Sequence, residues 1–259
     1  MHARGEEAVI WHPDETERWV RLLQIEGAPR QTIRGSAQPW DTGGIFSLLI
    51  RTRDIESVLQ RATDIGWGSF NDIEVMSFEG HDNRNVVLRG PDGVCFGLYE
   101  SASDPAPHDF GAPFTAQQMV RAIDPARGFY ADVLGWTPWF DGQTRLAINH
   151  FGMPANYKGK MPKKVAIMHA RPETFGQVEL VQWEIFEGRD VAGRAIPPNR
   201  GHLALRLPVD DLDGALERAN HALGTAIEAQ PVDLAPFGTV RLAGITTPDG
   251  ALIEVLEPQ

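Results

Sequence analysis

Apolar and polar positions along the chain alternate between strand-like and helix-like spacing. Residues 201–207 alternate with aliphatic side chains, which predicts a strand. The following segment starts at Asp211 as a helix N-cap, keeps apolar residues at helical spacing and stops at Gly224, which predicts a helix. Three more strands are expected over residues 226–231, 239–246 and 251–256, with a turn at residues 247–250.

The same order of elements is expected over residues 116–187. A strand near residues 117–122 precedes a helix that starts at Asp124 as N-cap, has Pro125 in its first turn and runs to Gly135. Further strands are expected near residues 145–149, 165–170 and 178–186. Each pattern is one βαβββ module, so residues 114–259 contain two modules.

The first half of the chain repeats the second half. Residues 91–100 match residues 248–257 at an offset of 157, and residues 20–24 match residues 178–182 at an offset of 158. The chain is therefore a tandem duplication. In this alignment the second half is complete, whereas the first half lacks its opening strand and helix.

The duplication predicts the domain organisation. Residues 1–103 are expected to form an incomplete N-terminal domain, and residues 114–259 a complete C-terminal domain. The stretch 104–113 is rich in Pro and Gly without apolar periodicity, which is typical of a linker. The predicted fold class is α+β, with tandem βαβββ modules that form curled mixed sheets.

Composition narrows the class of protein. The chain has 259 residues, 42% of them hydrophobic, and its 24 Lys and Arg against 35 Asp and Glu give a net charge of −11. This acidic balance argues against nucleic acid or an anionic membrane surface as the main partner. No apolar run has the length of a membrane span, no secretory signal is recognisable, and the single Cys95 cannot form an intrachain disulfide. We therefore expect a soluble cytoplasmic protein.

Several short motifs connect the sequence to a known superfamily. They are Phe129-Tyr130 with Leu134-Gly135, residues 201–205, Asp210-Asp211-Leu212, and Pro248-Asp249-Gly250 followed by Glu254. With these motifs the sequence resembles the vicinal oxygen chelate superfamily, which holds glyoxalase I, methylmalonyl-CoA epimerase, extradiol dioxygenases and the bleomycin and fosfomycin resistance proteins. The resemblance covers both halves and implies a glyoxalase-like fold.

The duplication also points to candidate site residues. His202 falls opposite Ile45 of the first half, Glu254 opposite Gly97, and Glu179 opposite Arg21. The expected strands place each of these three side chains on a face shared with apolar neighbours. Two carboxylates and an imidazole that converge in a curled sheet predict a divalent cation site. The alternatives are a buried core histidine for His202 and a charge-tolerant surface position for Glu179.

The resemblance adds a fourth ligand and assigns roles. It places Gln117 at the first ligand position, with Gln118 or Thr115 as alternatives, so that Gln117, Glu179, His202 and Glu254 have the Gln/Glu/His/Glu order of zinc-type glyoxalase I. Zinc, nickel, cobalt or manganese would suit this set. In this resemblance Glu254 is the base, and Glu179 is a ligand or second proton carrier. Arg121 is expected to pair with a substrate carboxylate, and Trp183 to line the pocket.

These residues lead to three functional hypotheses. The first is a metal-dependent lyase or isomerase of the glyoxalase I type, which acts on a small substrate with vicinal oxygens through an enediolate-like intermediate. The second is a non-catalytic small-molecule binding or resistance protein of the same fold. The third, extradiol ring cleavage, would require a histidine where the chain has Gln117. A homodimer could cover the open sheet edge of the first half.

Overall fold

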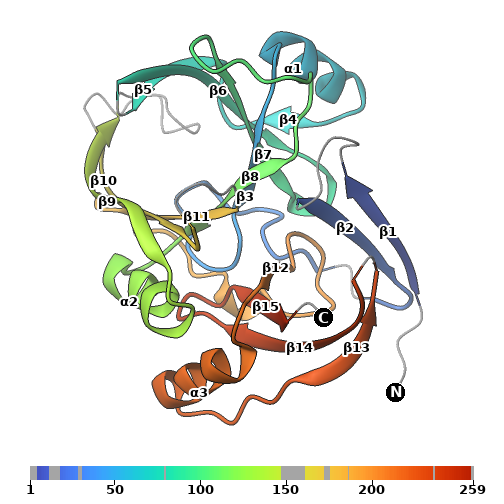
Figure 1. The fold of residues 1–259 in the computed structure, drawn as a ribbon. Coiled ribbons are helices and arrows are strands. Elements are labelled where there is room, and N and C mark those ends of the chain that lie inside the picture. The colour runs from blue at the N-terminus through green and yellow to red at the C-terminus, as the bar shows by residue number, and fades with distance from the viewer. Residues whose placement is uncertain are drawn as a thin grey trace.

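A computed structural model describes residues 5–11, 18–28, 31–78, 80–146, 161–171, 176–185, 187–235 and 237–257. The strands form three sheets, of nine, four and two strands, and the helices lie on the outer sides of the nine-stranded and four-stranded sheets (Figure 1). The predicted α+β class with βαβββ modules and curled mixed sheets is confirmed.

The largest sheet curls into an open ring and contains strands from both halves of the sequence (Figure 1). At its centre β3 pairs with β8 in antiparallel orientation, and β8 pairs with β11 in parallel. The strands in order are β4 (Gly68–Ser69), β6 (His81–Arg89), β7 (Cys95–Ser101), β3 (Ser47–Arg51), β8 (Pro113–Met119), β11 (Gln177–Trp183), β10 (Met161–His169) and β9 (Thr137–Leu146), and β5 (Glu74–Phe78) pairs with β6.

The other two sheets come from the ends of the chain. The four-stranded sheet follows the order β12 (Ala204–Pro208), β15 (Leu252–Glu257), β14 (Gly238–Thr246) and β13 (Gln230–Leu234). The hairpin of β1 (Gly5–Trp11) and β2 (Trp19–Ile25) forms the third sheet. Counted along the chain, the first module contains β1 and β2, the second β3 to β7, the third β8 to β11 and the fourth β12 to β15. The nine-stranded sheet therefore joins the second module to the third, across the predicted division between residues 103 and 114.

Local sequence signals fix the ends of two helices. In α1 (Ile55–Asp64) the Asp54 carboxylate accepts a hydrogen bond from the Ser57 N–H, and in α3 (Leu212–Leu223) Asp211 does the same for Gly214. Gly224 ends α3 at φ 64°, a left-handed conformation that glycine adopts without a steric penalty. The prediction of both α3 boundaries is confirmed.

The prediction of the preceding helix is wrong at its start. The helix α2 (Ile123–Gly128) begins with Ala122 as N-cap and has no side-chain cap, and a π-helical turn over residues 129–133 continues it. Asp124 lies in the first turn, where its charge favours the helix dipole, and pairs with Arg127.

Some predicted strands are shifted along the chain. The strand expected near residues 117–122 is β8, which begins at Pro113 and ends at Met119. Its polar residues Gln117 and Gln118 lie inside the strand, where both are buried and hydrogen-bonded. The strand expected at residues 226–231 lies at Gln230–Leu234. The strand expected near residues 145–149 begins much earlier, at Thr137. Residues 147–149 lie outside the described part of the chain.

The main core lies between the helices α2 and α3 and the sheets beside them. Tyr130, Leu180, Leu212 and Ile253 are each 0% exposed in this cluster. A second apolar cluster occupies the opposite, inner side of the nine-stranded sheet and contains Phe46, Val87, Cys95, Met119, Met161, Val181 and Trp183. The inner side of the ring is therefore part of the buried interior.

Two linking segments, 31–46 and 187–203, are hydrogen-bonded to each other in equivalent ways. The Ile33 N–H donates to the Arg200 carbonyl, and the Val191 N–H donates to the Thr42 carbonyl. Each residue of the first bond lies 158 positions from its equivalent in the second, which is the offset of the sequence repeat. The duplication is thus preserved as an approximate two-fold symmetry between the linking segments.

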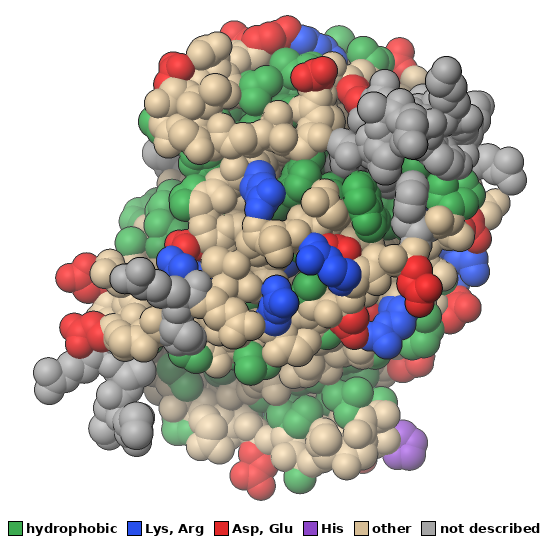
Figure 2. Space-filling model, turned by 180° about the vertical axis from the view of Figure 1, so that it is seen from behind, with side chains coloured by type: hydrophobic (Ala, Val, Ile, Leu, Met, Phe, Trp, Pro, Cys, Tyr) green, Lys and Arg blue, Asp and Glu red, His purple; other side chains and the backbone are tan. Residues whose placement is uncertain are grey.

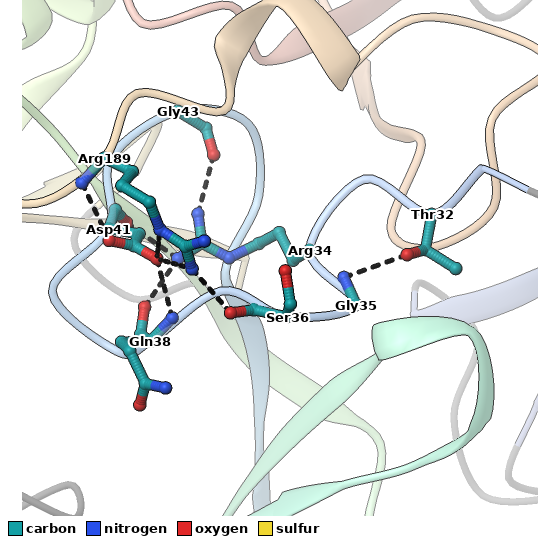
Figure 3. A network of polar contacts seen from close by, with 8 residues as sticks. All are labelled: Thr32, Arg34, Gly35, Ser36, Gln38, Asp41, Gly43 and Arg189. Carbon is teal, nitrogen blue, oxygen red and sulfur yellow. Dashed lines mark hydrogen bonds and ion pairs between the residues drawn. The ribbon is translucent and has the colours of Figure 1, made fainter.

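A buried ion network ties the same two segments together (Figure 3). Arg34, which is 4% exposed, donates to the carbonyls of Gly43 and Asp41. The Asp41 carboxylate, itself 1% exposed, accepts hydrogen bonds from the backbone and guanidinium of Arg189. Burial lowers the pKa of Arg34 to about 10, so this guanidinium stays charged at neutral pH.

No helix among the described residues is long and apolar enough to cross a membrane. Lys and Arg side chains lie among Asp and Glu side chains on the face shown in Figure 2. The acidic excess of the sequence therefore forms no continuous single-sign patch on that face.

Candidate functional site at the inner face of the nine-stranded sheet

Buried polar side chains meet on the inner face where the second and third modules join. The registers place Ser47 opposite Gln117, and Gln117 opposite Glu179. Met119, Val181 and Trp183 follow at alternate positions and belong to the inner apolar cluster, which fixes the direction of this face. We call the group of Ser47, Gln117, Glu179 and Lys163 the inner polar cluster.

A chain of hydrogen bonds crosses three strands of this cluster. The Ser47 hydroxyl donates to Gln117 Oε1 over 2.7 Å, and Gln117 Nε2 donates to Glu179 Oε2 over 2.7 Å. Ser47 and Gln117 are 0% and 1% exposed, and Glu179 is 9% exposed. The Gln117 amide is oriented by both neighbours and holds one carboxylate oxygen of Glu179 in place.

The other Glu179 oxygen faces an ammonium group. Lys163 Nζ lies 3.9 Å from Glu179 Oε1 and 5.7 Å from the centroid of the Trp183 ring. Burial lowers the pKa of Lys163, and the charge of Glu179 opposes that shift. Glu179 and Lys163 thus form a buried acid–base pair beside an aromatic wall.

Further polar groups from the second module face the same interior. Burial raises the pKa of Tyr99, and the nearby charge of Glu179 raises it further. Asn85 lies opposite Tyr99 in the ladder and Thr144 opposite Lys163. The buried oxygens Asn85 Oδ1 and Thr144 Oγ1 have no hydrogen-bond partner, which is uncommon for interior polar atoms.

His202 lies away from this cluster. Its Nε2 is 2.8 Å from the Cys95 carbonyl oxygen and its ring packs on the edge of Phe96. Burial lowers the pKa of His202 to about 4, against a favourable backbone hydrogen bond, so the imidazole is neutral at pH 7. His202 joins the start of the fourth module to the β7 strand.

Glu254 lies in a different group of charges. Its Oε2 accepts a hydrogen bond of 2.9 Å from Arg206 Nε, on the neighbouring strand β12. Glu7 and Arg21 of the β1–β2 hairpin form a second ion pair, and each of them feels the charge of the Arg206–Glu254 pair. Among these four residues, Arg21 is the equivalent of Glu179 of the inner polar cluster by the sequence offset of 158.

The four predicted metal ligands make different contacts in the structure. Gln117 is hydrogen-bonded to Glu179, but among the described residues Glu179, His202 and Glu254 do not form a group whose ligand atoms all lie within 4.8 Å of one another. The physical reason is the pairing of modules: the third module shares a sheet with the second, whereas the fourth faces the hairpin. Glu179 therefore lies with Gln117 and Lys163, and Glu254 lies with Arg206.

The two residues expected to contact substrate differ in position. Trp183 lies in the inner apolar cluster beside Lys163, at 6% exposure. Arg121 follows β8 at the surface and forms an ion pair with Asp190, with 67% of its side chain exposed. Arg121 therefore lies outside the inner polar cluster.

The sequence reasoning missed Lys163, Ser47 and Tyr99. Residues 157–164 are rich in lysine and glycine, a composition typical of a solvated loop, but β10 begins at Met161 and turns Lys163 inward. The available signal was alternation, because Lys163, Val165 and Ile167 share the face that pairs with Trp183, Val181 and Glu179. Residues 157–160 lie outside the described part.

Comparisons with known proteins support the fold. No family model matches the chain, and no curated protein does. Among solved structures, glyoxalase I from Zea mays matches with a TM-score of 0.59 and 16% identity over 93% of this chain and 74% of that chain. A putative dioxygenase from Bacillus subtilis matches with a TM-score of 0.51 and 9% identity, over 93% of this chain and 68% of that one. The chain has the fold of the vicinal oxygen chelate superfamily.

The vicinal oxygen chelate fold does not by itself supply a metal site here. The inner polar cluster offers one carboxylate, one amide and one hydroxyl, and its amide oxygen already accepts a hydrogen bond from Ser47. The Lys163 ammonium lies beside the one carboxylate and would repel a divalent cation. Gly97 on the facing strand β7 contributes no side chain. The described residues of this cluster therefore do not fit a divalent metal ion.

A separate acidic group lies at the start of α1. Asp54, Glu56 and Glu100 have ligand atoms within 4.8 Å of one another. Arg84 forms ion pairs with both Glu56 and Glu100, and Asp54 caps the helix. Their charges are already used in these contacts, so this group adds no metal centre.

Proposed function

We propose that this protein binds a small organic molecule at the inner face of the nine-stranded sheet and that Glu179 is the polar anchor for it. The observation that carries the proposal is the Glu179 carboxylate, held by Gln117 at 2.7 Å and facing Lys163 at 3.9 Å inside an apolar wall. The ligand would carry a carbonyl or hydroxyl group, ideally two on adjacent carbons. A carbonyl or a hydroxyl can accept a hydrogen bond from Lys163, and a hydroxyl can also donate one to Glu179.

The energetic cost of this cluster supports a functional role. Burying a carboxylate and an ammonium removes both from water, and a hydrophobic pair of similar size is often equally stable. Asn85 Oδ1 and Thr144 Oγ1 add two unsatisfied acceptors in the same interior. A polar ligand would satisfy groups that the fold alone leaves without partners.

Metal-independent proton transfer is the second candidate, and the Lys163–Glu179 geometry favours it. With an α-hydroxycarbonyl substrate, the Glu179 carboxylate would take the proton from the carbon that bears the hydroxyl and return it to the former carbonyl carbon, while the hydroxyl proton passes to the former carbonyl oxygen. Lys163 would donate a hydrogen bond to the oxygen that becomes negative. This retains the isomerase hypothesis from the sequence, but with an ammonium in place of the expected divalent ion.

A ligand screen tests the proposal. Thermal shift and calorimetry on the full chain would use hydroxy-carbonyl compounds, thiol conjugates and CoA esters, with and without EDTA. We expect saturable binding by the wild type that EDTA leaves unchanged and that Glu179→Gln weakens by about tenfold. Glu217→Gln on the exposed side of α3 is the matched control. Binding that requires a stoichiometric metal, or that survives Glu179→Gln, would reject the proposal.

A further inference from the structure

Tyr99 brings a phenol to the inner face of the nine-stranded sheet from the side opposite Lys163. Tyr99 lies on β7 and Lys163 lies on β10, and the strands β3, β8 and β11 separate the two along the sheet. Cys95, Gly97 and Tyr99 share one face of β7, and Cys95 belongs to the inner apolar cluster, so the Tyr99 side chain points inward. The curled sheet therefore presents Tyr99 and Lys163 to one interior from two sides (Figure 1).

The Tyr99 ring leans back along its strand, towards the row of residues that contains Glu179. A Cβ atom added to Gly97 would lie 3.5 Å from Tyr99 Cε2, so the ring lies over Gly97. Gly97 pairs with Leu49, two positions from Ser47, which begins the chain of hydrogen bonds to Glu179. The edge of the phenol ring thus approaches the inner polar cluster.

The fold itself makes no use of the Tyr99 hydroxyl. In the part of the chain that the structure describes, this hydroxyl makes no hydrogen bond, and the recorded ring contact of Tyr99 is with Phe114, at 5.9 Å between centroids. Asn85 lies opposite Tyr99 and is 1% exposed, yet its Oδ1 also has no partner, so the two side chains do not bond to each other. Two polar groups from the second module therefore face the interior unpaired.

The charge of Glu179 nevertheless acts on the phenol. Burial and this charge together hold the pKa of Tyr99 well above its usual range, so the hydroxyl keeps its proton at neutral pH. Tyr99 is half-buried, whereas Glu179 is 9% exposed. Tyr99 is thus a neutral hydrogen-bond donor that lies near the Glu179 carboxylate without being bonded to it.

Tyr130 shows what a tyrosine looks like where the fold uses its hydroxyl. Tyr130 is 0% exposed in the main core, and its hydroxyl accepts a hydrogen bond of 2.7 Å from Gln118 Nε2. Phenylalanine at that position would leave the buried Gln118 amide without its partner. At Tyr99 phenylalanine would supply the same ring contacts with no loss, which favours a role for the Tyr99 hydroxyl toward a ligand.

We propose that Tyr99 is a specificity-determining residue, whose hydroxyl donates a hydrogen bond to a second oxygen of the ligand while Lys163 binds the first. This assignment rests on the function proposed above. A ligand with both a carbonyl and a hydroxyl group can pair with both donors, whereas a simple ketone leaves the Tyr99 donor unpaired in the closed site. The site would therefore select hydroxy-carbonyl compounds over ketones of the same size.

The first experiment asks whether the fold needs the hydroxyl. Tyr99→Phe should leave the midpoint of urea unfolding of the full chain unchanged, because no hydrogen bond is lost. Tyr130→Phe is the matched control and should lower the midpoint, since Gln118 loses its partner. If Tyr99→Phe lowers the midpoint as far as Tyr130→Phe does, the hydroxyl is bonded within the fold, and the proposal is overturned.

The second experiment measures selectivity with two probes, phenacyl alcohol and acetophenone, which differ by one hydroxyl group. Calorimetry on the full chain should show that the wild type binds phenacyl alcohol more tightly. Tyr99→Phe should weaken the binding of phenacyl alcohol about fivefold and change that of acetophenone less than twofold. Tyr130→Phe, which removes a hydroxyl outside the inner face, should keep the selectivity of the wild type.

The outcomes separate this proposal from the function on which it rests. If Glu179→Gln weakens the binding of phenacyl alcohol but Tyr99→Phe does not, or if Tyr99→Phe weakens both probes equally, the role of Tyr99 is overturned and the binding site at Glu179 stands. Absence of saturable binding of phenacyl alcohol to the wild type also overturns the role of Tyr99. The wider ligand screen with Glu179→Gln then decides the proposed function by itself.

Discussion

Arg21 on β2 occupies the position that Glu179 occupies on β11, with Val9 opposite the one and Ile167 opposite the other. The two equivalent positions carry opposite charges, and they differ in burial. Glu179 lies against Lys163 in a buried interior, whereas Arg21 pairs with Glu7 near the surface. Only the interior beside Glu179 combines an acid–base pair with unsatisfied polar atoms, among the residues that the structure describes.

The Lys163–Glu179 pair should be strongly coupled in stability. Lys163→Met leaves a buried carboxylate without its ammonium, and we expect a loss of about 2 kcal/mol in the free energy of unfolding. Glu179→Gln should cost a similar amount. The double variant should cost clearly less than both losses together, as urea denaturation of all four proteins would show. Additive losses would mean that the two side chains do not interact.

Glu254 and Glu179 should separate in function. Because Glu254 pairs with Arg206 outside the inner polar cluster, Glu254→Gln should leave ligand affinity within about twofold of the wild type. Glu179→Gln should reduce it by about tenfold. Calorimetry with any ligand from the screen compares the two. The opposite order would restore Glu254 as the residue that acts on the ligand.

Asp41 should make the protein sensitive to acid. Burial tends to raise the pKa of Asp41, but hydrogen bonds from Arg189 and two backbone N–H groups outweigh it and lower the pKa below 3.8. A lowered pKa in the folded state stabilises the protein above pH 3.8, and this contribution is lost as the pH falls through the folded-state pKa.

Asp41→Asn should therefore flatten the loss of stability below pH 4 in acid unfolding curves, and should cost about 2–3 kcal/mol at pH 7. Asp233→Asn, at an exposed position, is the control. An unchanged acid limb in Asp41→Asn would show that the network with Arg34 and Arg189 does not set it.

His202 should act in a different pH window. Its pKa is about 4 in the folded state against 6.5 as the reference value, so the unfolded chain binds a proton first as the pH falls. Stability should decrease between pH 6.5 and pH 4 by at most about 3 kcal/mol from this residue. His202→Gln should remove that slope, measured by urea denaturation at several pH values. The exposed His221→Gln is the control, and an unchanged slope in His202→Gln would contradict the assignment.

Local features of the fold could be predicted from the sequence. Asp211 and Gly224 marked both ends of α3, because an N-cap carboxylate and a left-handed glycine act within one turn of the chain. The order of the modules could be predicted as well, because the duplication is recognised by comparing residues of the sequence position by position. Asp124 was misplaced as a cap because Ile123 enters the helix from the core side.

The candidate site could be predicted only in part, because it depends on which modules share a sheet. Alternation placed Glu179, His202 and Glu254 on mixed strand faces, but it carries no information on which faces meet. The pairing of β3 with β8 unites Gln117 and Glu179 with Ser47, and it leaves Glu254 with Arg206. The inward position of Lys163 could not be predicted, because its strand begins within a stretch of lysines and glycines whose composition is typical of a loop.

The two linking segments also determine how the molecule comes apart. Since residues 31–46 and 187–203 are hydrogen-bonded to each other and share the Arg34–Asp41–Arg189 network, neither sheet can separate without exposing a buried guanidinium. Heat or urea should therefore unfold both halves in one cooperative transition. Cleavage of either segment should destabilise the nine-stranded and the four-stranded sheet together.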